Sequence, residues 1–233
     1  MGIQTQPLFF APLRVFFNIH THLPLGHAQT IEVESLHLNQ AKSPSAAFQS
    51  VGLHPWYLNG LHWTEAEQWL HTQAAQANNF AIGEAGLDKK CDTPWEVQMQ
   101  AFEQCIKVSE TQQLPLIIHC VRAFSELIRL KKRLKPTQAW ILHGFQKNPA
   151  IAQQCLDAGC YLSYGEALLQ EKGHTAASLM QTPVTQLFLE TDRSNAAIAD
   201  IYQKTASLLG IEMGSLTAQI EQNWSRINPK RAV

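Results

Sequence analysis

Charged residues are scarce in this chain. Only 16% of its 233 residues are Asp, Glu, Lys or Arg, and 18 basic against 19 acidic side chains leave a formal net charge of −1. A protein that coats nucleic acid through bulk charge needs a basic surplus, so any nucleic-acid contact here must be local. Apolar residues make up 45%, which suffices for a sizeable core and excludes a disordered chain.

Other features are missing as well. The five cysteines contain no C-x-x-C pair, and their irregular spacing disfavours a disulfide framework. The apolar stretch 7–17 is interrupted by Pro12 and Arg14 and is too short to span a bilayer. We therefore expect a cytoplasmic protein with no membrane contact. Because no linker or repeat divides the chain, we interpret residues 1–233 as a single domain.

Short apolar runs alternate with amphipathic stretches, which implies parallel strands joined by crossover helices. Seven runs are interpreted as buried strands: 15–20, 48–53, 80–84, 116–119, 139–143, 160–163 and 187–190. With a possible eighth at 31–38, the pattern predicts an α/β fold of the TIM-like (β/α) barrel kind. A doubly wound open sheet is the alternative, which the lack of a Gly-rich loop after the first run disfavours.

Capping signals place several helices between these runs. Thr-x-x-Glu capping boxes begin at Thr64 and Thr93, and the second would put Pro94 at the first helical position. Asn148 precedes a proline and predicts the start of another helix, closed by Gly159. Periodic patterns predict two further helices over Ile198–Leu209 and Met213–Ile227.

One segment looks too short for a complete barrel, which typically needs about 250 residues. Only 28 residues separate His22 from Val51, and no convincing helix fits before 31–38. We therefore expect a barrel that is slightly trimmed near its first βα unit and that exposes apolar strand surface there. Either Phe9, Phe10 and Leu13 or a partner subunit in a homo-oligomer would cover this surface.

Histidine is abundant, with ten residues. His20 and His22 end the first run two positions apart, so both imidazoles can reach one ion. Four more metal-capable residues stand at the ends of later runs: Glu84, His119, His143 and Asp192. Taken singly, histidines and carboxylates are more commonly core, surface or capping groups, but beside apolar strands they are costly to bury unless paired or metal-bound. Because strand ends converge on one barrel face, these six residues together suit two divalent ions.

Several motifs resemble those of one family, the TatD-type metal-dependent deoxyribonucleases of the amidohydrolase superfamily. The resemblance spans about residues 15–228 and implies a barrel hydrolase in which two divalent metals (Mg, Mn or Zn) activate a bridging water to cleave phosphodiester bonds, with DNA as substrate. The motifs are NIHTHL at 18–23, VGLHP at 51–55, AIGEAGLD at 81–88, LIIH at 116–119, LHGF at 142–145 and LETD at 189–192.

The resemblance also assigns roles residue by residue. It implies that Glu84 bridges both metals and that Asp192 serves as the catalytic base as well as a ligand. The remaining ligands would divide between the two ions: His20 and His22 with Asp192 on one, and His119 and His143 on the other. His54, at the end of a strand before a proline turn, is either a phosphate contact or a structural histidine.

This chain departs from the family pattern mainly on the substrate side. Asn18 replaces an Asp near the first metal, which puts metal affinity in doubt more than metal binding. Arg122 stands one position later than the family's usual arginine, and Trp56 replaces a second histidine after His54. Arg122 and Trp56 are therefore candidate contacts for a phosphate and a base. Arg193 follows Asp192 where the family has a small residue.

Two other functions remain open at this stage. One is an amidohydrolase that cleaves a C–N or ester bond in a small molecule, which the near-neutral charge mildly favours. The other is a non-catalytic partner subunit that keeps the metal ligands for stability or recognition. The intact ligand set disfavours the second alternative.

Overall fold

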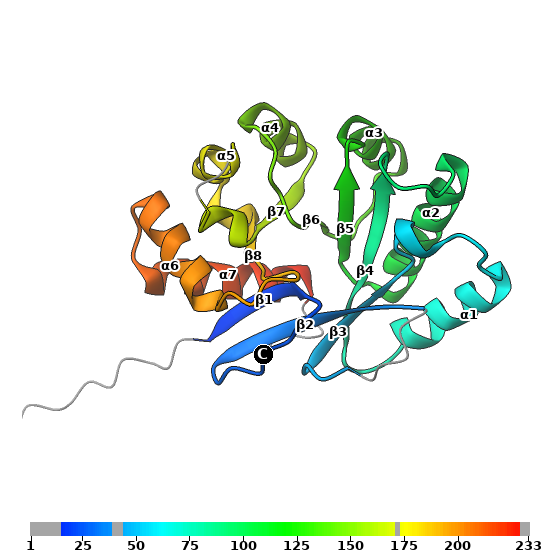
Figure 1. The fold of residues 1–233 in the computed structure, drawn as a ribbon, viewed down its shortest axis with the longest axis horizontal. Helices are drawn as coiled ribbons and strands as arrows, with labels where there is room; N and C mark the ends of the chain where they lie inside the picture. Colours follow the sequence, from blue (N-terminus) through cyan, green and yellow to red (C-terminus); the bar gives the residue numbers. More distant parts are fainter. Residues whose placement is uncertain (1–14, 39–43, 171–172, 229–233) are drawn as a thin grey trace, which may run out of the picture.

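A computed structural model describes residues 15–38, 44–170 and 173–228. One sheet of eight parallel strands runs in sequence order from β1 to β8. The bridge Thr21–Asp192 then joins the end of β1 to the residues after β8, so the sheet is a nearly closed barrel (Figure 1). The expected TIM-like barrel is confirmed, and the open sheet is wrong. The strands are β1 Phe16–Thr21, β2 Thr30–His37, β3 Phe48–Gly52, β4 Asn79–Asp88, β5 Leu116–Val121, β6 Trp140–Leu142, β7 Cys160–Tyr164 and β8 Leu187–Leu189.

Helices connect most neighbouring strands and lie outside the barrel (Figure 1). Ile198–Leu209 and Met213–Ile227 are helical over the predicted ranges. The structure has α1 Trp63–Ala74, α2 Trp95–Gln112, α3 Phe124–Leu134, α4 Pro149–Asp157, α5 Thr175–Gln181, α6 Ile198–Leu209 and α7 Met213–Ile227, with the short 3₁₀ turns η1 Pro55–Tyr57, η2 Glu166–Leu168 and η3 Val184–Gln186.

The capping predictions have mixed outcomes. Asn148 caps α4 as predicted, because its side chain accepts a hydrogen bond from the Ile151 amide. The two capping boxes are wrong: α1 begins one residue before Thr64, and Pro94 is the N-cap of α2 rather than its first residue. The Thr93 hydroxyl instead donates to the Pro55 carbonyl at 2.6 Å, which ties the start of α2 to η1.

The barrel is trimmed where the sequence predicts it. Residues 22–29 join β1 to β2 without a helix (Figure 1). The helices that pack on β1 come from the end of the chain, with the Tyr202 ring of α6 4.9 Å from that of Phe16 and the Trp224 ring of α7 5.1 Å from that of Phe17. The β2 face toward this crossover is not apolar, which corrects the sequence expectation. Glu32 is buried there and accepts hydrogen bonds from the Gly26 and Leu25 amides at 3.0 and 3.4 Å.

Glu34, two residues further along β2, also accepts hydrogen bonds from backbone amides, here from residues shortly before β3. Its buried carboxylate accepts hydrogen bonds from the Ser45 and Ala46 amides at 2.6 and 3.2 Å. Two buried carboxylates on β2 thus satisfy amides of the described residues that flank this strand. Phe9, Phe10 and Leu13, proposed as a cover, lie outside the described residues.

The described helices include none that combines the length and the apolar character needed to cross a membrane. The single domain, the cytoplasmic location and the homo-oligomer stay predictions.

Candidate metal centre

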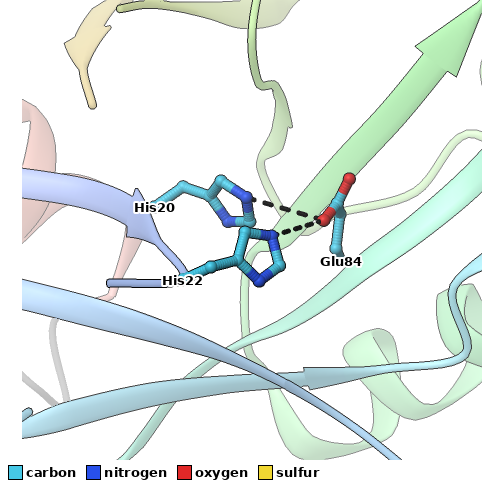
Figure 2. A group of neighbouring side chains, drawn as sticks. All are labelled: His20, His22 and Glu84. Carbon is cyan, nitrogen blue, oxygen red and sulfur yellow. Dashed lines mark hydrogen bonds and ion pairs between the residues drawn. The ribbon is translucent and has the colours of Figure 1, made fainter. Parts of the chain in front are cut away.

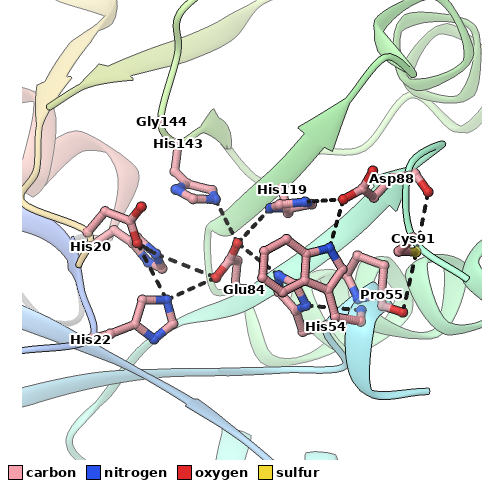
Figure 3. A network of polar contacts seen from close by, with 12 residues as sticks. His20, His22, His54, Pro55, Glu84, Asp88, Cys91, His119, His143 and Gly144 are labelled. Atoms are coloured by element: carbon pink, nitrogen blue, oxygen red, sulfur yellow. Dashed lines mark hydrogen bonds and ion pairs between the residues drawn. The ribbon is translucent and has the colours of Figure 1, made fainter. Parts of the chain in front are cut away.

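The predicted metal ligands come together at the carboxyl ends of the strands (Figure 3). His20 lies within β1 and His119 within β5, while His22 and His143 directly follow β1 and β6. Glu84 was expected to end its strand, but β4 continues to Asp88. The pairing register of β4 with β5 shifts between Ile82 and Ala85, and such irregularities re-aim side chains.

Glu84 is the centre of the cluster. Its Oε1 lies 2.7 Å from Nε2 of His143, 2.8 Å from Nδ1 of His119 and 3.1 Å from Nε2 of His54. Its Oε2 lies 3.2 Å from Nε2 of His22, which projects from the other side of the barrel (Figure 2). Burial alone would raise the pKa of Glu84, but these imidazoles hold it well below the usual range. Glu84 is therefore an ionised carboxylate surrounded by nitrogen donors.

Glycines allow the strands beside Glu84 to approach closely. Gly86 has φ 153°, and a Cβ on it would lie 2.0 Å from the carbonyl oxygen of His119. A Cβ on Gly83, with φ 144°, would lie 2.5 Å from the Ile117 carbonyl oxygen. Side chains at these positions would separate β4 from β5 and move Glu84 away from His119.

Asp192 is fixed by the strand it faces. Its carbonyl accepts from the His22 amide at 2.8 Å, and its own amide donates to the His20 carbonyl at 3.1 Å. Its backbone is left-handed, with φ 52°, a conformation that non-glycine residues adopt mostly where the surroundings enforce it. Burial opposes ionisation of its side chain, but the contact with His20 lowers the pKa of Asp192. Asp192 is thus ionised with its side chain 43% exposed at the mouth.

His20 has no hydrogen bond to complete its environment. Both ring nitrogens are buried without a partner, and Nε2 lies 3.6 Å from Glu84 Oε2 and 3.7 Å from Asp192 Oδ1. Buried polar atoms are rarely left unpaired, and these separations are too long for hydrogen bonds. A divalent ion coordinated by the imidazole and the two carboxylates would satisfy all three groups. The residues present therefore fit a metal.

His119 and His143 are each held by a second carboxylate. Nε2 of His119 lies 3.1 Å from Asp88 Oδ2, and Nδ1 of His143 lies 3.3 Å from Glu190 Oε1. Burial opposes protonation of His143, but the charges of Glu84 and Glu190 raise its pKa well above the ordinary value. Carboxylates on the far nitrogen commonly orient metal-binding histidines.

Asp88 and Glu190 were missing from the set of residues singled out in the sequence. Both stand inside quoted motifs, Asp88 four positions after Glu84 and Glu190 two before Asp192. Asp88 is 3% exposed and Glu190 is 0% exposed, so each buried carboxylate needs a specific partner. The available signal was a carboxylate inside a motif, at the last position of 81–88 for Asp88 and at the second position of 189–192 for Glu190.

Asn18 does not face the metal cluster directly. Its side chain accepts from the Thr191 amide at 3.0 Å and donates to the Thr191 hydroxyl at 2.8 Å and to Glu32 Oε1 at 3.3 Å. It therefore holds the residue next to Asp192. An aspartate here would place a second negative charge beside Glu32, which gives a physical reason for the asparagine.

His54 reaches into the cluster from beyond the end of β3. Its Nδ1 accepts a hydrogen bond from the Trp56 amide at 3.1 Å, so in the neutral ring Nε2 carries the hydrogen. That Nε2–H points at Glu84 Oε1, 3.1 Å away. In this tautomer His54 is a donor to an anionic oxygen, and it has no lone pair on Nε2 for a metal.

Trp56 and Arg122 lie at the rim. Trp56 is 48% exposed, and its indole N–H donates to Asp88 Oδ2 at 2.7 Å, which fixes the ring 5.5 Å from that of His119. Arg122 is exposed just after β5 with φ 56°. No carboxylate among the described residues pairs with its guanidinium. Both remain predicted substrate contacts.

The fold and the site define a class: a parallel barrel with a histidine–carboxylate metal site at the carboxyl ends of its strands. Residues 16–228 match the family model described as TatD related DNase. Since this match covers most of the chain, the protein belongs to that family.

Individual relatives agree with this assignment. The chain is 31% identical over 173 residues to the 3'-5' ssDNA/RNA exonuclease TatD of Yersinia pseudotuberculosis, covering 72% of this chain and 65% of that protein. It is 28% identical over 149 residues to the metal-dependent hydrolase YabD of Bacillus subtilis, covering 62% of this chain and 58% of that protein. The alignments therefore span less than two-thirds of these relatives.

Solved structures share the fold. The TatD homologue YjjV from Escherichia coli superposes with a TM-score of 0.79 at 19% identity, covering 92% of this chain and 98% of that one. A TatD family protein from Entamoeba histolytica gives a TM-score of 0.74 at 15% identity, covering 92% and 98% of the two chains.

Proposed function

We propose that this protein is a metal-dependent phosphodiesterase that hydrolyses DNA, with two divalent ions at the barrel mouth. The observation that carries the proposal is the arrangement around Glu84, whose two carboxylate oxygens face imidazoles from opposite sides of the barrel. The exonuclease name of the Yersinia relative supports nucleic acid as the substrate class.

Glu84 would bridge the two ions. His20, His22 and Asp192 would hold one, and His119 with His143 the other. The mixture of imidazole and carboxylate ligands suits Zn²⁺ or Mn²⁺ better than Mg²⁺, which prefers oxygen. Bound ions of this kind lower the pKa of a water and stabilise charge on phosphate oxygens.

Side chains would accept the proton of the water and bind the substrate. Ionised Asp192, partly open to the mouth, would accept the proton of the attacking water. The Nε2–H of His54 would donate to a phosphate oxygen in place of Glu84. The fixed indole of Trp56 offers a face for an unpaired base, and Arg122 supplies a cation at the rim.

The test compares substrates on one metal-loaded preparation. The protein is incubated with Mg²⁺, Mn²⁺ or Zn²⁺ and with single-stranded DNA, bis(p-nitrophenyl) phosphate or a panel of amides and esters. We expect phosphodiester cleavage that is lost in Glu84→Gln and kept in Glu103→Gln, a surface control paired with Arg133. Cleavage of amides or carboxylic esters alone would assign the small-molecule activity instead. Full metal occupancy without any turnover would favour a binding role.

A further inference from the structure

A cavity of about 440 Å³ lies beside the metal cluster, and the proposed hydrolysis gives it no role. Its volume is within the range of about 300–1,000 Å³ that is typical of ligand pockets. Three segments surround it: η1 with the turn that follows, the turn after β4, and the end of β5. The residues that matter below are Trp56 and Asn59 from the first segment, Asp88, Lys90 and Asp92 from the second, and Val121 from the third.

The cavity shares one wall with the metal cluster. Asp88 lines it, and Oδ2 of this residue accepts the hydrogen bond of the Trp56 indole and lies 3.1 Å from Nε2 of His119. Asp88 is on the side of Glu84 away from His22 (Figure 3). A group bound in the cavity would therefore lie next to the His119 side of the site.

Hydrogen bonds fix this wall without a ligand. The side chain of Gln98 on α2, 2% exposed, donates to the carbonyls of Asp88 and Thr93 at 3.0 and 2.8 Å and accepts from the Asp88 amide at 2.8 Å. The Lys90 amide donates to Asp88 Oδ1 at 2.7 Å. The turn after β4 is thus held to α2, and the Trp56 indole is held to that turn. A ligand would meet a preformed surface, which reduces the entropy lost on binding.

The charges around the cavity favour a neutral group over a phosphate. Lys90 supplies one positive charge, whereas Asp88 and Asp92 supply two negative charges. An anion in the cavity would therefore meet net repulsion. Trp56, 48% exposed, offers an aromatic face, and the half-buried Val121 adds apolar surface. Of the parts of a nucleotide, the base matches such a surface, because every base has a face that stacks on aromatic rings.

The polar lining residues can bind the edge of a base. Asn59, Lys90 and Asp92 are exposed, and no ion pair within the described part of the chain engages Lys90 or Asp92. An amide both donates and accepts hydrogen bonds, an ammonium group donates, and a carboxylate accepts. The edge of a nucleobase also carries donors and acceptors, and an unpaired base exposes this edge together with its face.

We propose that this cavity binds the nucleobase of the nucleotide next to the scissile phosphate, on the His119 side of the site. The base stacks on Trp56, and its edge contacts Asn59, Lys90 and Asp92. The proposal deepens the proposed function and rests on it. It makes single-stranded nucleic acid the substrate class, since a base in a duplex is stacked and paired.

The test removes one base at a time from a bound strand. Anisotropy of a labelled six-nucleotide single-stranded DNA gives the Kd for the Zn²⁺-loaded protein, and phosphorothioate linkages make the strand resistant to cleavage. Six further strands each lack one base. For the wild type, removing the base that occupies the cavity should weaken binding about tenfold, an effect typical of one base stacked on an aromatic side chain. Removing the other bases should have less effect.

Variants then locate that base. Trp56→Leu should bind the complete strand about tenfold more weakly and lose nothing further when that base is missing. Trp56→Phe keeps an aromatic face but not the hydrogen bond to Asp88, and it should bind nearly as well as the wild type. Asn59→Ala should weaken binding about fivefold, as for one hydrogen bond, and only on strands that carry the base. Gln76→Ala, an exposed amide before the opposite end of β4, is the control and should bind like the wild type.

Each departure from this pattern has a definite meaning. Binding by the wild type that depends on no base, or a base whose removal costs the wild type and Trp56→Leu equally, would overturn the proposal. Equal losses in Trp56→Phe and Trp56→Leu would also overturn it, since the indole would then act through its hydrogen bond to Asp88. Asn59→Ala that binds like Gln76→Ala would place the base outside the cavity. The expected binding pattern without cleavage of any phosphodiester would instead remove the proposed function and leave the base site.

Discussion

The two halves of the metal cluster differ in how the protein supports them. His119 and His143 each contact Glu84 through one nitrogen and a second carboxylate through the other. His20, across the barrel, has no hydrogen bond on either nitrogen. The first half is built by hydrogen bonds within the protein, whereas the second is completed only when an ion is bound.

This difference indicates which interactions are structural and which serve the metal. A side chain that is satisfied without metal contributes to folding and also to the site. A side chain that is buried and unsatisfied costs stability and is retained for its ligand.

The largest effect is expected from His143→Leu. Removing this ring leaves the carboxylates of Glu84 and Glu190 buried without a cation, and breaking a buried charge pair in this way costs about 3–5 kcal/mol. Urea unfolding of the metal-free protein measures the loss. A change below about 1 kcal/mol would contradict the view that this half is held together without metal.

Asp88→Asn probes the same half more gently. The amide keeps the shape but removes the charge that orients His119, and such changes typically weaken metal binding by about 10–100-fold. Competition with a chelator gives the affinity, and Asp92→Asn, an exposed neighbour, is the control. Equal affinities for the two variants would show that Asp88 only anchors Trp56.

Metal binding should depend on pH because of His143. Its raised pKa keeps the ring protonated at neutral pH in the metal-free protein, so an ion must displace that proton. Glu84 and Asp192, whose pKa values are lowered, are already ionised and add no dependence. From pH 6 upward the affinity should rise by up to about tenfold per unit until the folded pKa is passed. Calorimetry in buffers of different ionisation enthalpy would detect the released proton. A metal affinity that does not change with pH would contradict the release of a proton from His143.

The smallest effect is expected from His20→Leu. Leucine removes two unsatisfied buried nitrogens, so the metal-free protein should not lose stability and should gain about 1 kcal/mol. Stabilisation by added metal should decrease at the same time. A loss of stability comparable to that of His143→Leu would abolish the distinction between the two halves.

The sequence predicts the barrel well because strand position is encoded locally, in apolar runs such as 116–119 and 187–190. The absence of a helix after His22 is equally readable from length. The first residues of the helices were harder to predict, because Thr93 forms a hydrogen bond with Pro55, a residue distant in sequence. The hydrogen bonds of Glu32 and Glu34 to loop amides were not predictable, because they depend on which amides lie over β2.

Within the site, the candidate metal ligands were easier to predict than the residues that orient them. The convergence of Glu84 with the imidazoles follows from strand ends sharing one face of a barrel. Asp88 and Glu190 were missed because only the three-dimensional structure places them on the far nitrogens of His119 and His143. The tautomer of His54 likewise depends on a backbone amide.

The most direct test of the account is the metal-loaded crystal structure with anomalous scattering measured at the metal edge. We expect two ions bridged by Glu84, with His20, His22 and Asp192 on one and His119 and His143 on the other. Ions bound away from Glu84, or a single ion that leaves His20 without a ligand, would contradict the two-metal site.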